Sequence, residues 1–163
     1  MVDDNPGDVR LVQAAVRQIG SALEVIPAVD GDSALLFLFA ASRRPEDLPS
    51  LILLDLNLPG KTGFEVLDVI RAQPLLKTIP VVVLTSSNRE EDVELSYAHG
   101  ANSFISKPGS FDELCQVIAG LEHYWFRFCR IPVPWQSNGT QAARPFSAPA
   151  EAIGSLALEF PLL

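Results

Sequence analysis

The chain is 163 residues long, 48% of them hydrophobic, and carries a formal net charge of −8. This size suits one domain with a hydrophobic core plus an extension, and the even spread of apolar residues excludes disorder of the whole chain. The acidic balance argues against nucleic-acid binding, which needs clustered Lys and Arg. No apolar run approaches the roughly 20 residues that span a bilayer, and two cysteines cannot build a disulfide framework. We therefore expect a cytoplasmic protein that engages neither nucleic acid nor membrane.

The first part of the chain predicts helices alternating with strands. An acidic turn over residues 3–8 leads into a helix that Gly20 ends, and a strand is expected over residues 23–29. Pro27 lacks an N–H donor, so this strand should lie at a sheet edge. The helix expected over residues 33–41 is nearly all apolar, which predicts that its neighbours cover it well.

An unbroken apolar run, residues 51–54, predicts a strand buried on both faces that ends on Asp55. Alternating strands and helices imply a parallel sheet with helices on both faces. Prolines accumulate after residue 130, so we expect a globular domain over residues 1–130 and a Pro-rich tail over 131–163 without its own core. The other expected elements are a helix from Phe64 to Pro74, a strand over 81–84, a helix from Arg89 to Gly100, a strand over 103–106 and a helix from Ser110 to Trp125.

Polar side chains follow four consecutive strands of this predicted sheet: Asp3 and Asp4, Asp55 with Asn57, Thr85, and Lys107. The carboxyl ends of parallel strands lie on one edge of a sheet, so these side chains can converge there. Clustered carboxylates repel one another unless a cation neutralises them, and an all-oxygen set suits Mg²⁺. With a lysine and a hydroxyl beside it, such a site suits a phosphoryl group, for which Asp55 is the natural nucleophile. Taken singly, each residue also has an ordinary structural explanation. Asp55 could cap a turn, Asp3 and Asp4 could form a solvated turn, Thr85 could be a strand-end hydroxyl, and Lys107 could be a surface charge.

Four segments resemble the signature of two-component receiver domains: 2–5 (VDDN), 54–63 (LDLNLPGKTG), 83–85 (VLT) and 104–108 (FISKP). The resemblance extends over roughly residues 1–125. It implies a flavodoxin-like (βα)5 fold, a doubly wound parallel sheet of strand order 2-1-3-4-5. It also implies a signalling switch rather than an enzyme, which a histidine kinase phosphorylates on Asp55 and which catalyses its own gain and loss of the phosphoryl group.

The resemblance assigns a role to each matching residue. Asp4 and Asp55 would coordinate Mg²⁺ directly, joined by the backbone carbonyl of Asn57, and Asp3 would act through water. Lys107 would pair with the phosphoryl group on Asp55.

Two further features are implied by the same resemblance. Thr85 would move toward the phosphoryl group, and Phe104, at the switch-aromatic position, would swing inward into the space that Thr85 vacates. The bond between Lys107 and Pro108 would be cis, which folded proteins permit almost only before proline.

A narrower resemblance lies in residues 5–8, 96–102 and 122–126, which are similar to the small single-domain regulators that partner phytochrome-type histidine kinases. Four aromatic side chains fall within residues 124–128 and cannot all face one side of a helix, so some should be exposed. They either cover the end of the core or bind a partner, since exposed aromatic patches are typical of interfaces. We expect a homodimer through the fourth and fifth helices.

The first strand departs from the receiver pattern. The family begins with several apolar residues, whereas only Met1 and Val2 precede the acidic turn here, so the first strand is truncated. In strand order 2-1-3-4-5 this strand is internal, and shortening it leaves backbone groups of both neighbours unpaired. We favour the explanation that a longer natural form of the chain supplies the rest of the strand. The alternative is that residues 155–160 (SLALEF) fold back into the vacant strand position.

Three other classes of protein stay open. A degenerate receiver scaffold that is never phosphorylated is suggested by the truncated strand, which should hold Asp3 and Asp4. A haloacid-dehalogenase-like phosphatase also uses a strand-end Asp with Mg²⁺, but it needs a second Asp where Asn57 stands. An FMN-binding module needs a phosphate loop rich in Thr and Gly, whereas paired carboxylates would repel phosphate. No DNA-binding module follows the receiver-like segment, so we expect output by protein contact.

Overall fold

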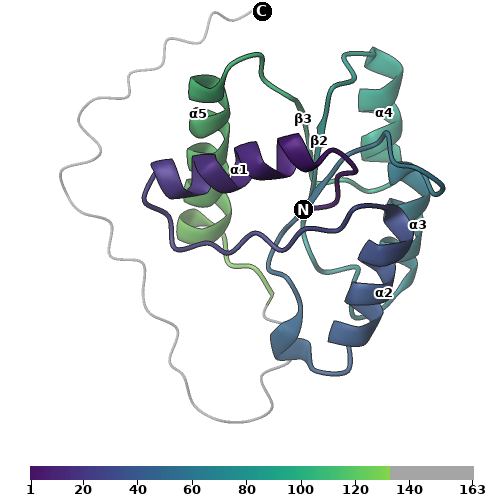
Figure 1. Ribbon diagram of the computed structural model, residues 1–163. Helices are drawn as coiled ribbons and strands as arrows, with labels where there is room; N and C mark the ends of the chain where they lie inside the picture. The colour runs from purple at the N-terminus through teal and green to yellow at the C-terminus, as the bar shows by residue number, and fades with distance from the viewer. Residues whose placement is uncertain (133–163) are drawn as a thin grey trace, which may run out of the picture.

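The computed structural model describes residues 1–132 and arranges them in layers around a parallel sheet (Figure 1). Helices α1 (Pro6–Gln18) and α5 (Phe111–Glu122) lie together on one side, and helices α2 (Gly31–Ala41), α3 (Gly63–Ala72) and α4 (Glu90–Ala98) lie on the other. The strands are β1 (Ile52–Leu54), β2 (Val81–Thr85) and β3 (Ser103–Ser106). A 3-10 turn, η1 (Pro45–Asp47), and a π-helix, η2 (His123–Phe128), complete the described elements. No helix within residues 1–132 is long and apolar enough to cross a membrane.

The sheet is parallel with order β1-β2-β3, and the first residues of the chain extend it beyond β1. Val2 forms parallel bridges with Leu54 on one side and Ala28 on the other. Its N–H donates to the Leu53 carbonyl at 2.8 Å, and the Asp55 N–H donates to the Val2 carbonyl at 3.0 Å. Counted along the chain, the extended segments therefore lie in the order 2-1-3-4-5, as the resemblance to receiver domains implies.

The first two strands are shorter than regular strands of this fold. The strand predicted over residues 23–29 reduces to a single bridge at Ala28, and the truncated first strand reduces to Val2. Residues 1–3 are the only described backbone between the two neighbours, so the ladder extends no further along them. An apolar cavity of about 480 Å³ lies beside them, lined by residues 22–29 and 49–53 together with side chains of α2 and α5. The alternative that residues 155–160 occupy this slot falls outside the described residues.

Four of the five α-helices within residues 1–132 begin at a side-chain cap, and α4 begins without one. Asn5 accepts a backbone hydrogen bond at the start of α1, and Thr62 forms a capping box with Glu65 at the start of α3. Ser110 accepts from the N–H of Glu113 at the start of α5. These bonds satisfy N–H groups that a helix start leaves without partners, so the predicted helices appear where they are expected.

Two details of the predicted helices are wrong. Helix α2 is not well covered, because only one stripe of it, including Leu38, packs into the core, while Leu36 on the opposite side is 72% exposed. The last α-helix does not continue to Trp125. It ends at Glu122 and passes into the π-helix η2, whose final backbone bond, from Cys129, reaches back five residues.

Two buried clusters hold the layers together. The larger lies between the sheet and helices α2 and α3 and includes Leu54 and Leu67, which are fully buried. The smaller joins α1 and α5 to the other face through Val12 and Ile118. Burying one such side chain is worth about 1.5–3 kcal/mol. Apolar packing on both faces therefore holds β1 in place, and with it the position of Asp55 at its end.

Gly63 opens α3 against the backbone of the loop after β1. A Cβ there would lie 2.5 Å from the Asp55 carbonyl oxygen and 2.7 Å from Leu56 Cα, closer than real contacts allow. We expect Gly63→Ala to lower the free energy of unfolding in urea by about 1–3 kcal/mol. Gly120→Ala is the control, because nothing lies within 4 Å of its Cβ position inside α5, and alanine there should stabilise by about 0.5–1 kcal/mol. Equal stability of the two variants would contradict the close packing we describe.

Candidate functional site

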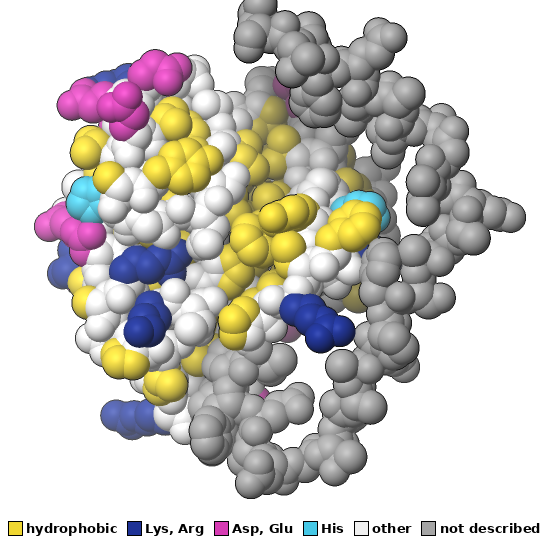
Figure 2. Space-filling view, turned by 180° about the vertical axis from the view of Figure 1, so that it is seen from behind, with side chains coloured by type: hydrophobic (Ala, Val, Ile, Leu, Met, Phe, Trp, Pro, Cys, Tyr) yellow, Lys and Arg dark blue, Asp and Glu magenta, His cyan; other side chains and the backbone are white. Residues whose placement is uncertain are grey.

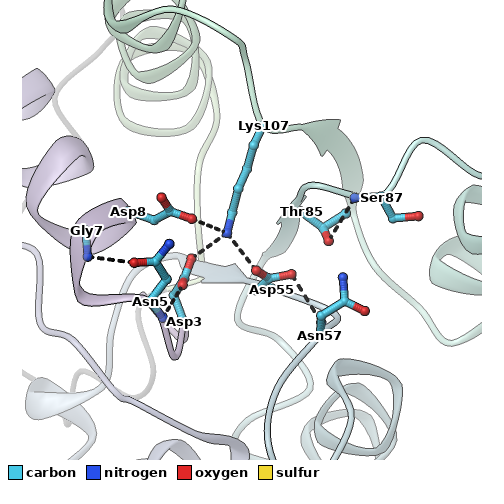
Figure 3. Close-up of polar contacts among 9 residues, drawn as sticks. All are labelled: Asp3, Asn5, Gly7, Asp8, Asp55, Asn57, Thr85, Ser87 and Lys107. Carbon is cyan, nitrogen blue, oxygen red and sulfur yellow. Dashed lines mark hydrogen bonds and ion pairs between the residues drawn. The ribbon is translucent and has the colours of Figure 1, made fainter.

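Lys107 stands at the centre of three carboxylates on the carboxyl edge of the sheet (Figure 3). Its Nζ lies 2.6 Å from Asp55 Oδ2, 2.7 Å from Asp8 Oδ2 and 2.9 Å from Asp3 Oδ2. Asp55 follows β1 and Lys107 follows β3, whereas the other two carboxylates flank the turn that starts α1. Segments far apart in the sequence therefore meet at one ammonium group.

The backbone holds the second oxygen of two of these carboxylates. Asp3 Oδ1 accepts a hydrogen bond from the Asn5 N–H at 2.9 Å, and Asp55 Oδ1 accepts one from the Asn57 N–H at 3.2 Å. Asn5 in turn caps α1, so the turn that presents Asp3 is continuous with the start of the helix. Each carboxylate is thereby oriented with its Oδ2 toward Lys107.

Burial and charge act in opposite directions on this cluster. The side chains of Asp3, Asp55 and Lys107 are 0%, 6% and 16% exposed. Burial raises the pKa of Asp3 and outweighs the opposing effects of the Lys107 ammonium and of the hydrogen bond from Asn5. Burial also acts to raise the pKa of Asp55, but hydrogen bonds, led by that from Lys107, outweigh it and lower this pKa below its usual value. The carboxylates overcome burial in the same way and raise the pKa of Lys107, so Asp55 and Lys107 are both charged at neutral pH.

Thr85 lies on β2, the strand next to the one that ends at Asp55, and Phe104 lies on β3, one strand further along the sheet. Thr85 ends β2 and is fully buried, and its hydroxyl oxygen accepts a hydrogen bond from the Ser87 N–H at 3.4 Å. Its carbonyl accepts from the Lys107 N–H at 2.6 Å, which ties the loop after β3 to the end of β2. Phe104 is half-buried on β3 against the larger core cluster. Thr85 therefore borders the site, and the switch roles of both residues stay predictions.

The peptide bond between Lys107 and Pro108 is trans, like the others in the described part of the chain, so the expected cis bond is wrong. Before proline the trans form is favoured by about 0.5–1 kcal/mol unless other contacts reverse the preference. The trans bond already lets the Lys107 ammonium reach its three carboxylates, and the site does not require the cis form.

The structure brings together only part of the predicted Mg²⁺ ligand set. Asp3 and Asp55 converge, whereas Asp4 and Asn57 are exposed, and residues 1–132 contain no group of three or more His, Cys, Asp or Glu side chains arranged for a metal ion. Asp3 Oδ2 is buried and, although ion-paired to Lys107, accepts no hydrogen bond. Two buried carboxylates, one with an oxygen free of hydrogen bonds, are the hard donors that Mg²⁺ prefers, so these residues fit a divalent cation. Ligation by Asp4 and by the Asn57 carbonyl stays a prediction.

Asp8 is the residue of the cluster that sequence reasoning missed. Its carboxylate is about as close to Lys107 as that of Asp55. In the sequence it looks like an ordinary acidic residue in the first turn of a helix, where its negative charge interacts favourably with the helix dipole. Its place in the sequence could have predicted this, because the first turn of a helix that follows a strand end lies at the same edge of the sheet as Asp3.

The comparisons with known proteins agree with this fold. The family model for the response regulator receiver domain matches residues 1–119, and the chain belongs to that family. Among its relatives is Response regulator Rcp1 of Synechocystis sp., 40% identical over 133 residues, which are 81% of this chain and 90% of that protein. The probable methanogenesis regulatory protein FilR2 of Methanothrix harundinacea is 35% identical over 134 residues, 82% of this chain and 86% of that protein.

Solved structures show the same similarity. The phosphorylated cyanobacterial phytochrome response regulator RcpA matches with a TM-score of 0.73 and 40% identity, over 80% of this chain and 94% of that one. The Mn²⁺-bound form of Rcp1 matches with a TM-score of 0.70 and 40% identity, over 80% and 95% of the two chains. The predicted receiver fold and the likeness to phytochrome response regulators are thus confirmed. The protein is a receiver domain of the two-component response regulators, a class of phosphorylation-controlled signalling switches rather than enzymes.

Removing Lys107 should destabilise this fold, because its carboxylates would be left buried without a cation. We expect Lys107→Met to lower the free energy of unfolding by about 3 kcal/mol in urea without divalent cations. Lys61→Met is the matched control, since Lys61 pairs with Asp32 in a contact whose side chains are 42% and 69% exposed and which solvent screens. Unfolding of both variants at the same urea concentration would show that the cluster does not constrain the fold.

Proposed function

We propose that this receiver domain accepts a phosphoryl group on Asp55 from a sensor histidine kinase and signals by contact with other proteins. The observation that carries the proposal is the buried Asp55 carboxylate at the end of β1, with Lys107 Nζ donating a hydrogen bond to it at 2.6 Å. The 40% identity to Rcp1 and to the phytochrome response regulator RcpA supports a phytochrome-type kinase as the donor.

In this mechanism an Asp55 oxygen attacks the phosphorus of a phosphohistidine. The new phosphorus–oxygen bond forms while the bond from phosphorus to the histidine nitrogen breaks, and the imidazole leaves. The lowered pKa of Asp55 keeps it ionised as the nucleophile. The Lys107 ammonium pairs with the charge on the phosphoryl oxygens. Asp3 and Asp55, with Asp4 and the Asn57 carbonyl, would hold Mg²⁺, which supplies further neutralisation of that charge when it is bound.

The same proposal covers the conformational response. Thr85 and Phe104 stand on the adjacent strands β2 and β3, which pair in parallel. The Thr85 hydroxyl would turn toward the phosphoryl group on Asp55, and the half-buried Phe104 would move inward. The domain would later release the group by self-catalysis: water adds to phosphorus, the bond to the Asp55 oxygen breaks, and inorganic phosphate leaves.

Incubation with acetyl phosphate and Mg²⁺ tests the phosphorylation. We expect intact-mass measurement to show one acid-labile phosphoryl group on the wild type and none on Asp55→Asn, because an amide cannot act as the nucleophile. Asp47→Asn is the matched control, since Asp47 is exposed in η1, outside the site, and this variant should be phosphorylated like the wild type.

The same experiment separates the alternatives. A wild type that carries no phosphoryl group would contradict the proposal and favour a degenerate scaffold. Steady release of phosphate from unrelated phosphomonoesters would favour a haloacid-dehalogenase-like phosphatase. Asn57 argues against that class, because it stands where the second Asp is needed and an amide is no acid/base group.

We also propose a homodimer through α4 and α5. Tyr97 on α4 is 52% exposed and Phe111 at the start of α5 is 38% exposed, and the predicted exposure of aromatic side chains beyond α5 is confirmed by Tyr124, at 55%. Figure 2 shows hydrophobic side chains gathered on the rear face of the molecule. Exposed apolar and aromatic surface of this kind is typical of interfaces.

Sedimentation velocity tests the dimer. We expect Tyr97→Ala and Trp125→Ala to weaken self-association relative to the wild type, because each removes aromatic area from the proposed interface. Leu36→Ala removes an even more exposed apolar side chain from α2, which packs against α3 rather than against α4 or α5, and this variant should associate like the wild type. A monomeric wild type, or an equal loss in Leu36→Ala, would refute this interface.

Two further expectations belong to the same proposal. The free cysteines Cys115 and Cys129 fit a reducing compartment, which supports the cytoplasm as the place of action. The division into a receiver over residues 1–130 and a tail over 131–163 stays a prediction, because the family match ends at residue 119 and the described residues end at 132.

A further inference from the structure

Asp8 is bound to the site lysine but differs from the other two carboxylates in its surroundings. Its Oδ2 accepts a hydrogen bond from Lys107 Nζ at 2.7 Å, against 2.6 Å for Asp55. The Asp8 side chain is 27% exposed, whereas those of Asp3 and Asp55 are 0% and 6% exposed. In Figure 3 Asp8 and Asp3 lie on one side of the ammonium group and Asp55 on the other. Asp8 therefore competes with Asp55 for the same cation from the solvent side of the cluster.

A lysine ammonium has only three N–H donors, and three carboxylates already surround this one. A phosphoryl group on Asp55 adds negative charge and new acceptor oxygens next to Lys107. Lys107 donates hydrogen bonds to Asp8 and Asp55 and is ion-paired to Asp3, so a shift of its ammonium toward the phosphoryl oxygens moves it away from one of these partners. Asp3 is fully buried, and leaving its charge unpaired would be costly. Asp8 is partly solvated, so water can replace the lysine at the lowest cost.

We propose that Asp8 is a positioning residue that holds Lys107 in the unphosphorylated state and must release it when Asp55 is phosphorylated. Its carboxylate opposes the phosphorylated state in two ways: it competes for the lysine, and its charge repels the phosphoryl oxygens. Asp8 also lies in the first turn of α1, so its release frees the start of this helix from the loop after β3. This inference rests on the proposed phosphorylation of Asp55.

Beryllofluoride, which attaches to a carboxylate as a stable mimic of a phosphoryl group, tests the competition at equilibrium. The titration is followed by ¹⁹F NMR of the bound beryllofluoride at saturating Mg²⁺, with Mg²⁺ binding measured separately for each variant. We expect Asp8→Asn to bind beryllofluoride roughly two- to tenfold more tightly than the wild type, the effect of one partly exposed charge-assisted contact. Asp8→Glu keeps the charge and should restore affinity to near the wild-type value.

Asp112→Asn is the matched control. Asp112 is an exposed acidic residue in the first turn of α5, so its substitution makes the same change of charge at a helix start away from Lys107. We expect its affinity for beryllofluoride to equal that of the wild type. Unchanged or weaker binding by Asp8→Asn, or equal tightening by Asp112→Asn, would overturn the proposal.

A second measurement needs neither metal nor phosphoryl mimic. In a double-mutant cycle of Asp8→Asn and Lys107→Met in urea without divalent cations, the two substitutions should be coupled by roughly two- to tenfold in the unfolding constant. Additive effects would show that the pair carries no energy and would overturn the proposal. If the wild type binds no beryllofluoride and gains no phosphoryl group while the cycle shows coupling, the proposed function fails and the ion pair stands. If the wild type is phosphorylated while the cycle shows additive effects, the proposed function stands and the role of Asp8 fails.

Discussion

The architecture of the site depends on one cation placed among three carboxylates. Lys107 ties together the end of β1, the turn before α1 and the loop after β3, and each of these segments would otherwise present a buried or half-buried negative charge to its neighbours. The lysine gains from the arrangement as well, because the carboxylates overcome the cost of its burial and raise its pKa. Electrostatic pairing at the sheet edge thus joins layers whose apolar cores lie elsewhere.

The backbone pairing of a single residue, Val2, positions the acidic turn at the site. Val2 pairs with the segments on both sides of it, and Asp3 follows directly, its N–H donating to the Ala28 carbonyl at 2.9 Å. The turn that presents Asp3 is therefore anchored although the first strand is reduced to one residue that bridges to both neighbours. The apolar cavity beside Val2 marks where this anchoring is thin, whereas Asp55 is held by a regular strand and by packing on both faces.

Asp3 and Asp4 are neighbours in this turn, but only Asp3 lies in the site, for a geometric reason. The extended backbone alternates its side chains, so Asp3 points into the site while Asp4 is exposed. The helix that follows then brings Asp8 back to the same edge. The negative charge at this end of the site therefore comes from Asp3 and Asp8, which a strand-to-helix turn separates, rather than from the consecutive pair Asp3 and Asp4. Because Asp8 is partly solvated, it can exchange Lys107 for water at the lowest cost in free energy.

The resemblance to receiver domains implied the strand order, whereas the sequence by itself determined the alternation of helices and strands and the convergence of Asp55, Thr85 and Lys107. These follow from local patterns, because apolar runs and caps define the elements and parallel strands bring their carboxyl ends to one edge. Only the tertiary structure decided that Asp8 joins the cluster while Asp4 stays outside, that the bond before Pro108 is trans, and that α2 leaves Leu36 exposed. Each of these features depends on contacts between segments that are far apart in the sequence. The residue pattern of a single segment does not specify such contacts.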